Sequence, residues 1–108
     1  AIKPGKSGRK LYEDTRAFFE DKGYRTSRNG DHWEGFFHGL GHGLGLEIHE
    51  YPGMGSRRGG RLKRGHVITV EPGLYYPQLG GCRIEDVVRV TGDGCEMLSK
   101  HPYKWEIS

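Results

Sequence analysis

The spacing of apolar residues predicts one amphipathic helix near the start of the chain. Ser7 is a suitable N-cap, and Lys22 followed by Gly23 is a typical helix stop. We therefore expect a helix from about Ser7 to Lys22 whose aromatic face packs against a sheet. The residues that recur at helical spacing on that face are Leu11, Tyr12, Thr15, Phe18 and Phe19.

The remaining pattern predicts short strands joined by turns. Val67–Val70 is β-branched throughout, and residues 83–90 (RIEDVVRV) form a second run rich in Val and Ile. Residues 36–38 suit a short strand, and Asn29-Gly30 indicates a loop or hairpin turn within residues 25–34. One helix and several strands in this order favour a single α+β domain.

Composition narrows the class of protein. Only 33% of the 108 residues are hydrophobic and 19 are Gly, which leaves a thin core. The chain begins at Ala1 without Met, so we expect a processed chain or a piece of a longer one. No apolar run approaches the roughly 18 residues of a membrane span.

A disulfide between Cys82 and Cys95 is one alternative, but two free, buried thiols in a cytoplasmic protein are the preferred interpretation.

The positive charge is concentrated in one segment. The formal net charge is +3, and residues 56–66 (SRRGGRLKRGH) supply much of it. A nucleic acid or another acidic partner could bind there. We prefer a solvated surface loop and expect no nucleic acid partner, because no aromatic side chains are interleaved with the charges.

The stretch HGLGHGLGLEIHE, residues 38–50, holds three histidines among four glycines. His38 and His42 have the spacing of zinc-binding helices, but each interior glycine would cost such a helix about 1 kcal/mol. Gly39 also occupies the position where that helical motif needs glutamate. The segment is therefore expected to be extended or looped, with its glycines allowing close backbone approach. Three histidines in such a loop favour a functional site.

Two glutamates lie at or within predicted strands. Glu71 ends the first strand, and Glu85 lies within residues 83–90 on the same face as Arg83. A buried carboxylate must be paired or metal-bound, and a salt bridge to Arg83 is an equal alternative. One His with two Glu suits a divalent ion that prefers oxygen ligands. Mn²⁺ fits, with Co²⁺, Zn²⁺ or Fe²⁺ tolerated, although three ligands are too few to hold two ions.

Three motifs in this order, HGLGHGLGLEIHE, VEPGLYY and GCRIEDVVRVT, resemble the C-terminal half of the pita-bread metallopeptidases. That family includes methionine aminopeptidase, aminopeptidase P, prolidase and creatinase, and the resemblance covers essentially the whole chain. The RIED and EPGLY forms are most similar to the prolidase and aminopeptidase P branch. The resemblance implies an antiparallel sheet with a packing helix and hydrolysis at Xaa-Pro bonds. Methionine aminopeptidase-type activity and a non-catalytic binding module are the alternatives.

The resemblance also implies residue roles. His42, Glu71 and Glu85 would bind two divalent metal ions, with Glu85 bridging them and Glu71 also acting as general base. His38 and His49 would act beside the substrate, hydrogen-bonding the scissile carbonyl or its developing oxyanion. Arg83 would orient Glu85 or contact the substrate. The family is often dimeric, so a homodimer is a further implication.

One departure from the family pattern limits what this chain can do alone. The family takes two more ligands, both Asp, from its N-terminal half, and no residue here supplies them. Asp14-Thr15-Arg16 echoes the family's D-x-T-R stretch but lies inside the predicted helix, so we reject it. We expect residues 1–108 to be the C-terminal part of a longer catalytic domain, partnered by the missing half and a peptide substrate. Alone, the chain should bind metal weakly and show little activity.

Overall fold

A computed structural model describes residues 1–103, which form one helix and nine strands. Helix α1 spans Gly8–Asp21, with Ser7 as N-cap and Lys22 as C-cap. The Ser7 hydroxyl accepts a hydrogen bond from the Lys10 amide, and Gly23 follows with φ +93°. Both boundaries of the predicted helix are confirmed, because capping signals act locally.

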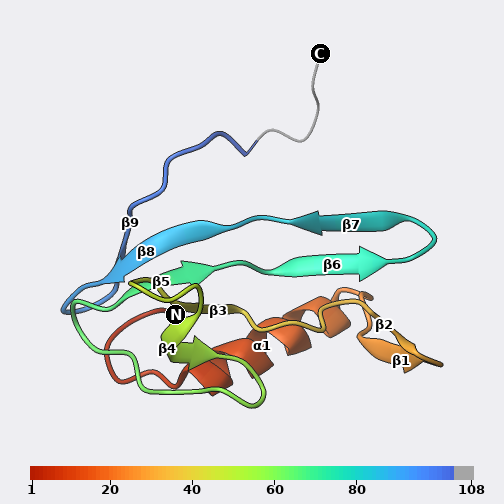
Figure 1. Cartoon of the computed structure of the whole chain (residues 1–108), viewed down its shortest axis with the longest axis horizontal. Helices are drawn as coiled ribbons and strands as arrows, with labels where there is room; N and C mark the ends of the chain where they lie inside the picture. Colours follow the sequence, from red (N-terminus) through yellow and green to blue (C-terminus); the bar gives the residue numbers. More distant parts are fainter. Residues whose placement is uncertain (104–108) are drawn as a thin grey trace.

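The central sheet is antiparallel and has five strands in the order β4-β3-β5-β8-β9. The predicted strand at 67–70 is confirmed as β5. Helix α1 lies below this sheet and contacts β4 (Figure 1). The strand bounds are β3 Gly41–Gly43, β4 Glu50–Met54, β5 Val67–Val70, β8 Asp86–Val90 and β9 Cys95–Met97.

Two smaller antiparallel pairs complete the fold. Strands β6 (Gly73–Tyr76) and β7 (Gly80–Arg83) form a ribbon that continues from β5 and β8, as Figure 1 shows. Strands β1 (Ser27–Asn29) and β2 (His32–Glu34) form the hairpin expected at Asn29-Gly30. Gly30 has φ +66°, a conformation that glycine adopts without strain.

The strand predicted over residues 83–90 is wrong in one respect, because it is broken at Ile84 and Glu85. The registers of β5–β8 and β6–β7 place Ile84 opposite Pro72. Proline has no N–H to donate, so a regular ladder cannot form there. One bond, from the Ile84 amide to the Pro72 carbonyl at 3.3 Å, spans the break.

The strand predicted at residues 36–38 is also wrong. The Phe36 amide donates to the Thr26 hydroxyl at 2.9 Å, and that hydroxyl donates to the Phe36 carbonyl. A side chain therefore satisfies backbone groups that a neighbouring strand would otherwise take. Strand β4, which the sequence pattern did not indicate, includes Pro52, and proline is tolerated because β4 is an edge strand.

The core lies between α1 and the sheet. Phe19 packs against this core, but Phe18, which we expected on the packed face, is 58% exposed. Phe18 is at the edge of the buried stripe, where its ring meets Lys22 instead of the sheet. The buried apolar residues are Leu11, Tyr12, Phe36, Leu40, Met54, Leu62, Ile68, Val88 and Val90.

The two cysteines are free, as predicted, but they are exposed and not buried. Cys82 lies on β7, whose four residues are all exposed because the ribbon is only two strands wide. Cys95 lies on β9, at the open edge of the central sheet. Within residues 1–103, no helix is long and apolar enough to cross a membrane.

Candidate metal centre

Glu71 lies between β5 and β6, Glu85 lies between β7 and β8, and the strand registers place these two residues opposite each other. Val70 pairs with Asp86, and Gly73 pairs with Arg83. Continuing either register makes Glu71 and Glu85 cross-strand neighbours, whose side chains share one face of the ribbon. Like charges directly opposite are destabilising. A cation between the two carboxylates would turn this repulsion into attraction.

His42 reaches the same face from the neighbouring strand β3. The pairing of Gly43 with Ile68 sets the β3–β5 register and puts His42 opposite Thr69, two residues before Glu71. The His42 Nε2 lies 3.7 Å from Glu71 Oε2, and both side chains are largely buried, 17% and 16% exposed. Strand β3, the junction between β5 and β6 and the junction between β7 and β8 therefore bring the three predicted ligands together.

The three side chains fit a divalent ion. One ligand atom from each of His42, Glu71 and Glu85 lies within 4.8 Å of the other two. His42 Nδ1 is 2.9 Å from the Gly43 carbonyl oxygen. Because a carbonyl only accepts, Nδ1 is the donor of this bond, which leaves Nε2 as the ring nitrogen available to a metal ion. Ligands about 2.1 Å from one tetrahedral ion lie about 3.4 Å apart, so only a small inward movement is needed.

The electrostatics of Glu71 agree with this geometry. Burial is the main cause that raises the pKa of Glu71, and the neighbouring Glu85 carboxylate raises it further. His42 and Arg83 oppose that rise, but only in part. A carboxyl that resists ionisation for these reasons gains much from a cation, which stabilises its charged form.

His38 lines the same pocket but differs from His42 in its surroundings. Its Nδ1 donates to the Gly39 carbonyl oxygen at 2.7 Å, because a carbonyl only accepts. That Nε2 is fully buried and has no hydrogen-bond partner among the described residues. It lies beside Gly73, where an added Cβ would come within 2.9 Å of it. The rings of Phe36 and Tyr75 contact the imidazole, with centroids 5.2 and 5.4 Å away.

His49 and Arg83 flank the cluster. The His49 ring stands edge-on to His42 with centroids 4.6 Å apart, and the His49 side chain is exposed. Arg83 Nη2 lies 3.7 Å from Glu85 Oε2, which is the salt bridge considered as the alternative. Glu85 therefore belongs to an ion pair and to the ligand cluster at once. Asp14 lies on α1, as predicted, and is paired with Lys10.

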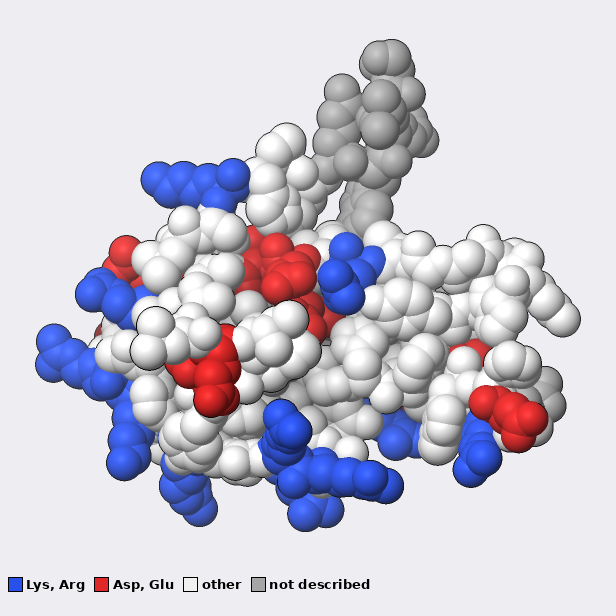
Figure 2. Space-filling view, in the orientation of Figure 1, with Lys and Arg blue, Asp and Glu red and all other residues white. Residues whose placement is uncertain are grey.

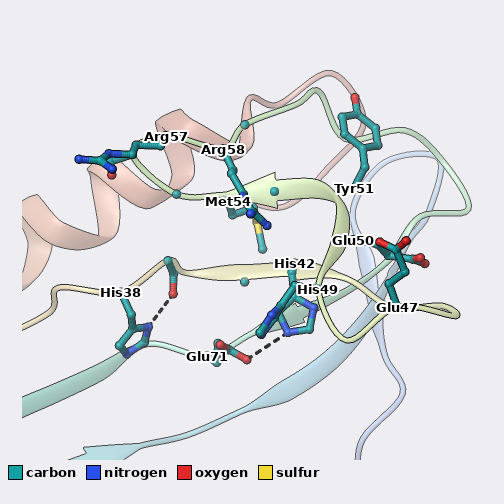
Figure 3. Close-up of a pocket in the computed structure, with 16 residues that line it drawn as sticks. His38, His42, Glu47, His49, Glu50, Tyr51, Met54, Arg57, Arg58 and Glu71 are labelled. Carbon is teal, nitrogen blue, oxygen red and sulfur yellow. Dashed lines mark hydrogen bonds and ion pairs between the residues drawn. The ribbon is translucent and has the colours of Figure 1, made fainter.

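A cavity of about 700 Å³ opens beside the cluster. Figure 3 shows His42, His49 and Glu71 along one side of it, with Arg57 and Arg58 across the cavity. Figure 2 shows Lys and Arg side chains along the lower margin of the molecule and an acidic group near the centre of this face. The lining of the cavity therefore carries both signs of charge.

Four charged residues of this cavity were not predicted as part of the site. Glu47 and Glu50 line it beyond His49, and Arg57 and Arg58 line it from the basic segment. The two glutamates gave no signal, and the basic segment was interpreted as a solvated loop because such a loop has the same composition. The buried Thr69, whose hydroxyl accepts from the His42 amide at 3.1 Å, was missed as well.

Comparison with known proteins decides the family. The sequence pattern described as metallopeptidase family M24 matches residues 1–92. The chain belongs to metallopeptidase family M24. The antiparallel sheet with its packing helix is consequently the C-terminal half of the pita-bread fold, and this prediction is confirmed.

Relatives within family M24 point to one branch. The chain is 46% identical over 100 residues to a protein from Pyrococcus furiosus named Xaa-Pro dipeptidase. It is similar to a solved Xaa-Pro dipeptidase from Bacillus anthracis, with 44% identity and TM-score 0.81 over 96% of this chain. An X-Pro aminopeptidase from Thermotoga maritima matches with 40% identity and TM-score 0.79 over 94%. The chain spans only about a quarter of these relatives, 26%, 27% and 27% of their lengths.

Proposed function

We propose that residues 1–108 are the C-terminal part of a peptidase domain that cleaves peptides at Xaa-Pro bonds. The observation that carries this proposal is the convergence of His42 Nε2 with two facing carboxylates, Glu71 and Glu85. The names of the relatives, Xaa-Pro dipeptidase and X-Pro aminopeptidase, support the substrate class. Since both names occur, dipeptidase and aminopeptidase action are alternatives within the proposal. A homodimer and a cytoplasmic location stay predictions.

His42, Glu71 and Glu85 would hold the metal, with Glu85 shared between two ions. Mn²⁺ is the proposed ion, because two carboxylates and one imidazole form a donor set dominated by oxygen. Two such ions would lower the pKa of a water molecule and polarise the scissile carbonyl. The remaining ligands would come from the preceding part of the parent chain.

The other residues would move protons and stabilise charge. The Glu71 carboxylate would accept a proton from the attacking water. His49, exposed beside His42, would donate a hydrogen bond to the carbonyl oxygen as negative charge develops there. His38 Nε2, which has no hydrogen-bond partner among the described residues, would exchange a proton with the substrate. Arg83 would hold Glu85 in place through their ion pair.

The test is hydrolysis of Xaa-Pro dipeptides and Xaa-Pro tripeptides by the full-length parent, with and without added Mn²⁺. We expect Mn²⁺-dependent release of the first residue. His42→Ala and Glu85→Gln should each lower kcat/KM by more than about 100-fold, because even indirect neighbours of a metal contribute 10–100-fold. His32→Ala, in the exposed β1–β2 hairpin, is the matched control.

The same assay separates the alternatives. Activity on Met-initiated peptides without proline at the second position would indicate methionine aminopeptidase-type action. Inertness toward every peptide, with and without Mn²⁺, would contradict the peptidase proposal and favour a binding module.

A further inference from the structure

We propose that Thr69 is a positioning residue that fixes the backbone of His42 and thereby aims its imidazole at Glu71 and Glu85. The inference deepens the proposed function and rests on it. Thr69 is the one buried polar residue among the described residues, at 2% exposure. A buried hydroxyl must be hydrogen-bonded, and here its partner is the amide of His42.

The register shows why this bond is unusual. On either side of it, β3 and β5 are joined by backbone bonds, from Leu44 N to Val67 O at 3.0 Å and from Glu71 N to Leu40 O at 2.7 Å. Midway between them, the His42 amide donates to the Thr69 hydroxyl at 3.1 Å. The acceptor for the His42 amide is thus a side-chain oxygen, whereas the acceptors on either side of it are backbone carbonyl oxygens.

Close packing leaves little freedom at this point. A Cβ at Gly41, the residue before His42, would lie 1.9 Å from the Thr69 carbonyl oxygen. The two backbones therefore approach as closely as glycine permits on one side of His42. On the other side, the His42 ring is held through Nδ1 by the Gly43 carbonyl. Thr69 supplies the remaining fixed point, so the direction of Nε2 depends on it.

Serine in place of Thr69 would retain the hydroxyl, whereas valine would replace it with a methyl of similar size. We would compare Thr69→Val and Thr69→Ser in the 108-residue chain without metal, by amide hydrogen exchange. In Thr69→Val, the His42 amide should exchange about five- to tenfold faster relative to the amides of Leu44 and Glu71. In Thr69→Ser, the ratio of the His42 exchange rate to the Leu44 and Glu71 exchange rates should stay as in the unsubstituted chain.

A second readout is the broadening of His42 imidazole signals by Mn²⁺, which detects weak binding. Thr69→Val should weaken Mn²⁺ binding about tenfold or more, and Thr69→Ser should restore it. If Thr69→Val does not fold, a comparison of Thr69→Ala with Thr69→Ser serves the same purpose, because these two variants differ by one oxygen atom.

The outcomes are distinguishable from failure of the proposed function. If Thr69→Val accelerated exchange equally at the amides of His42, Leu44 and Glu71, or at none of them, the proposed role of Thr69 would be overturned. Selective acceleration at His42 together with weaker Mn²⁺ binding would support it. If the unsubstituted chain, with its preceding segment present, left His42 unbroadened by Mn²⁺, the metal site itself would be contradicted. The exchange ratio would then still decide whether Thr69 fixes His42.

Discussion

At the scale of single residues, the site is a balance between burial and charge. Glu71 and Glu85 face each other across a ribbon, and burial already disfavours the charged form of Glu71. Such a pair destabilises the metal-free chain and becomes favourable only with a cation. His42 places its Nε2 beside Glu71 and opposes the rise in the Glu71 pKa only in part. The geometry therefore supports the proposed metal site.

The raised pKa of Glu71 predicts a pH dependence of stability in the metal-free chain. The folded state holds this proton more tightly than the unfolded state, so stability falls as pH rises above about 4.5, the ordinary value, through the raised pKa. Glu71→Gln does not titrate. We expect it to be more stable than the unsubstituted chain at neutral pH, with the difference disappearing below about pH 4.5.

Urea unfolding at a series of pH values, with a chelator present, measures this difference. Glu13→Gln is the control, since Glu13 forms only an exposed ion pair with Arg9 on α1. A Glu71→Gln variant that is less stable at pH 7, or a difference independent of pH, would contradict the account of Glu71.

At the scale of elements, close approach of β3 to β5 places His42 beside the glutamates. Gly41 permits that approach, because any side chain there would meet the backbone of Thr69. Gly41→Ala should therefore destabilise the chain by about 1–3 kcal/mol and weaken metal binding. Gly92→Ala is the matched control. Its Cβ would meet nothing within 4 Å, and its effect should stay within about 1 kcal/mol.

Thermal unfolding and Mn²⁺ titration of the two variants check this prediction. Equal stability of Gly41→Ala and Gly92→Ala would show that β3 can shift without cost. That result would remove the argument that glycine is required for the position of His42.

The elements also show what the sequence could and could not predict. Helix α1 and strand β5 were predicted because their capping and β-branched signals are local. The break at Ile84 was not, because its cause is Pro72 on the opposite strand. The ligands His42, Glu71 and Glu85 could be named from motifs, but their shared face depends on pairing between distant strands. Thr69 carried no sequence signal, since a threonine in a β-branched strand is ordinary.

At the scale of the whole molecule, the chain is about a quarter of its relatives' length and leaves large apolar side chains exposed. Leu46 and Ile48, in the loop between His42 and His49, are 104% and 84% exposed, and Leu79 is 89% exposed. Contiguous apolar surface marks contact sites, whereas single exposed apolar side chains are ordinary. Leu46 and Ile48, exposed in one loop, agree with the proposal that the catalytic domain has a further part.

That proposal predicts a difference in metal affinity between the chain and its parent. Residues 1–103, the part that the structure describes, offer three clustered ligands, which can hold one ion with open positions but not a well-held pair. We expect weak Mn²⁺ binding by this chain and at least about tenfold tighter binding by the full-length parent. Calorimetric titration measures both. Tight, stoichiometric binding of two Mn²⁺ ions by the 108-residue chain would contradict the prediction.

The most direct test is anomalous diffraction from crystals of the full-length parent soaked with Mn²⁺. We predict anomalous density bonded to His42 Nε2 and to carboxylate oxygens of Glu71 and Glu85, with Glu85 between two peaks. Density elsewhere, with the His42 imidazole and both carboxylates free of metal, would contradict the central claim.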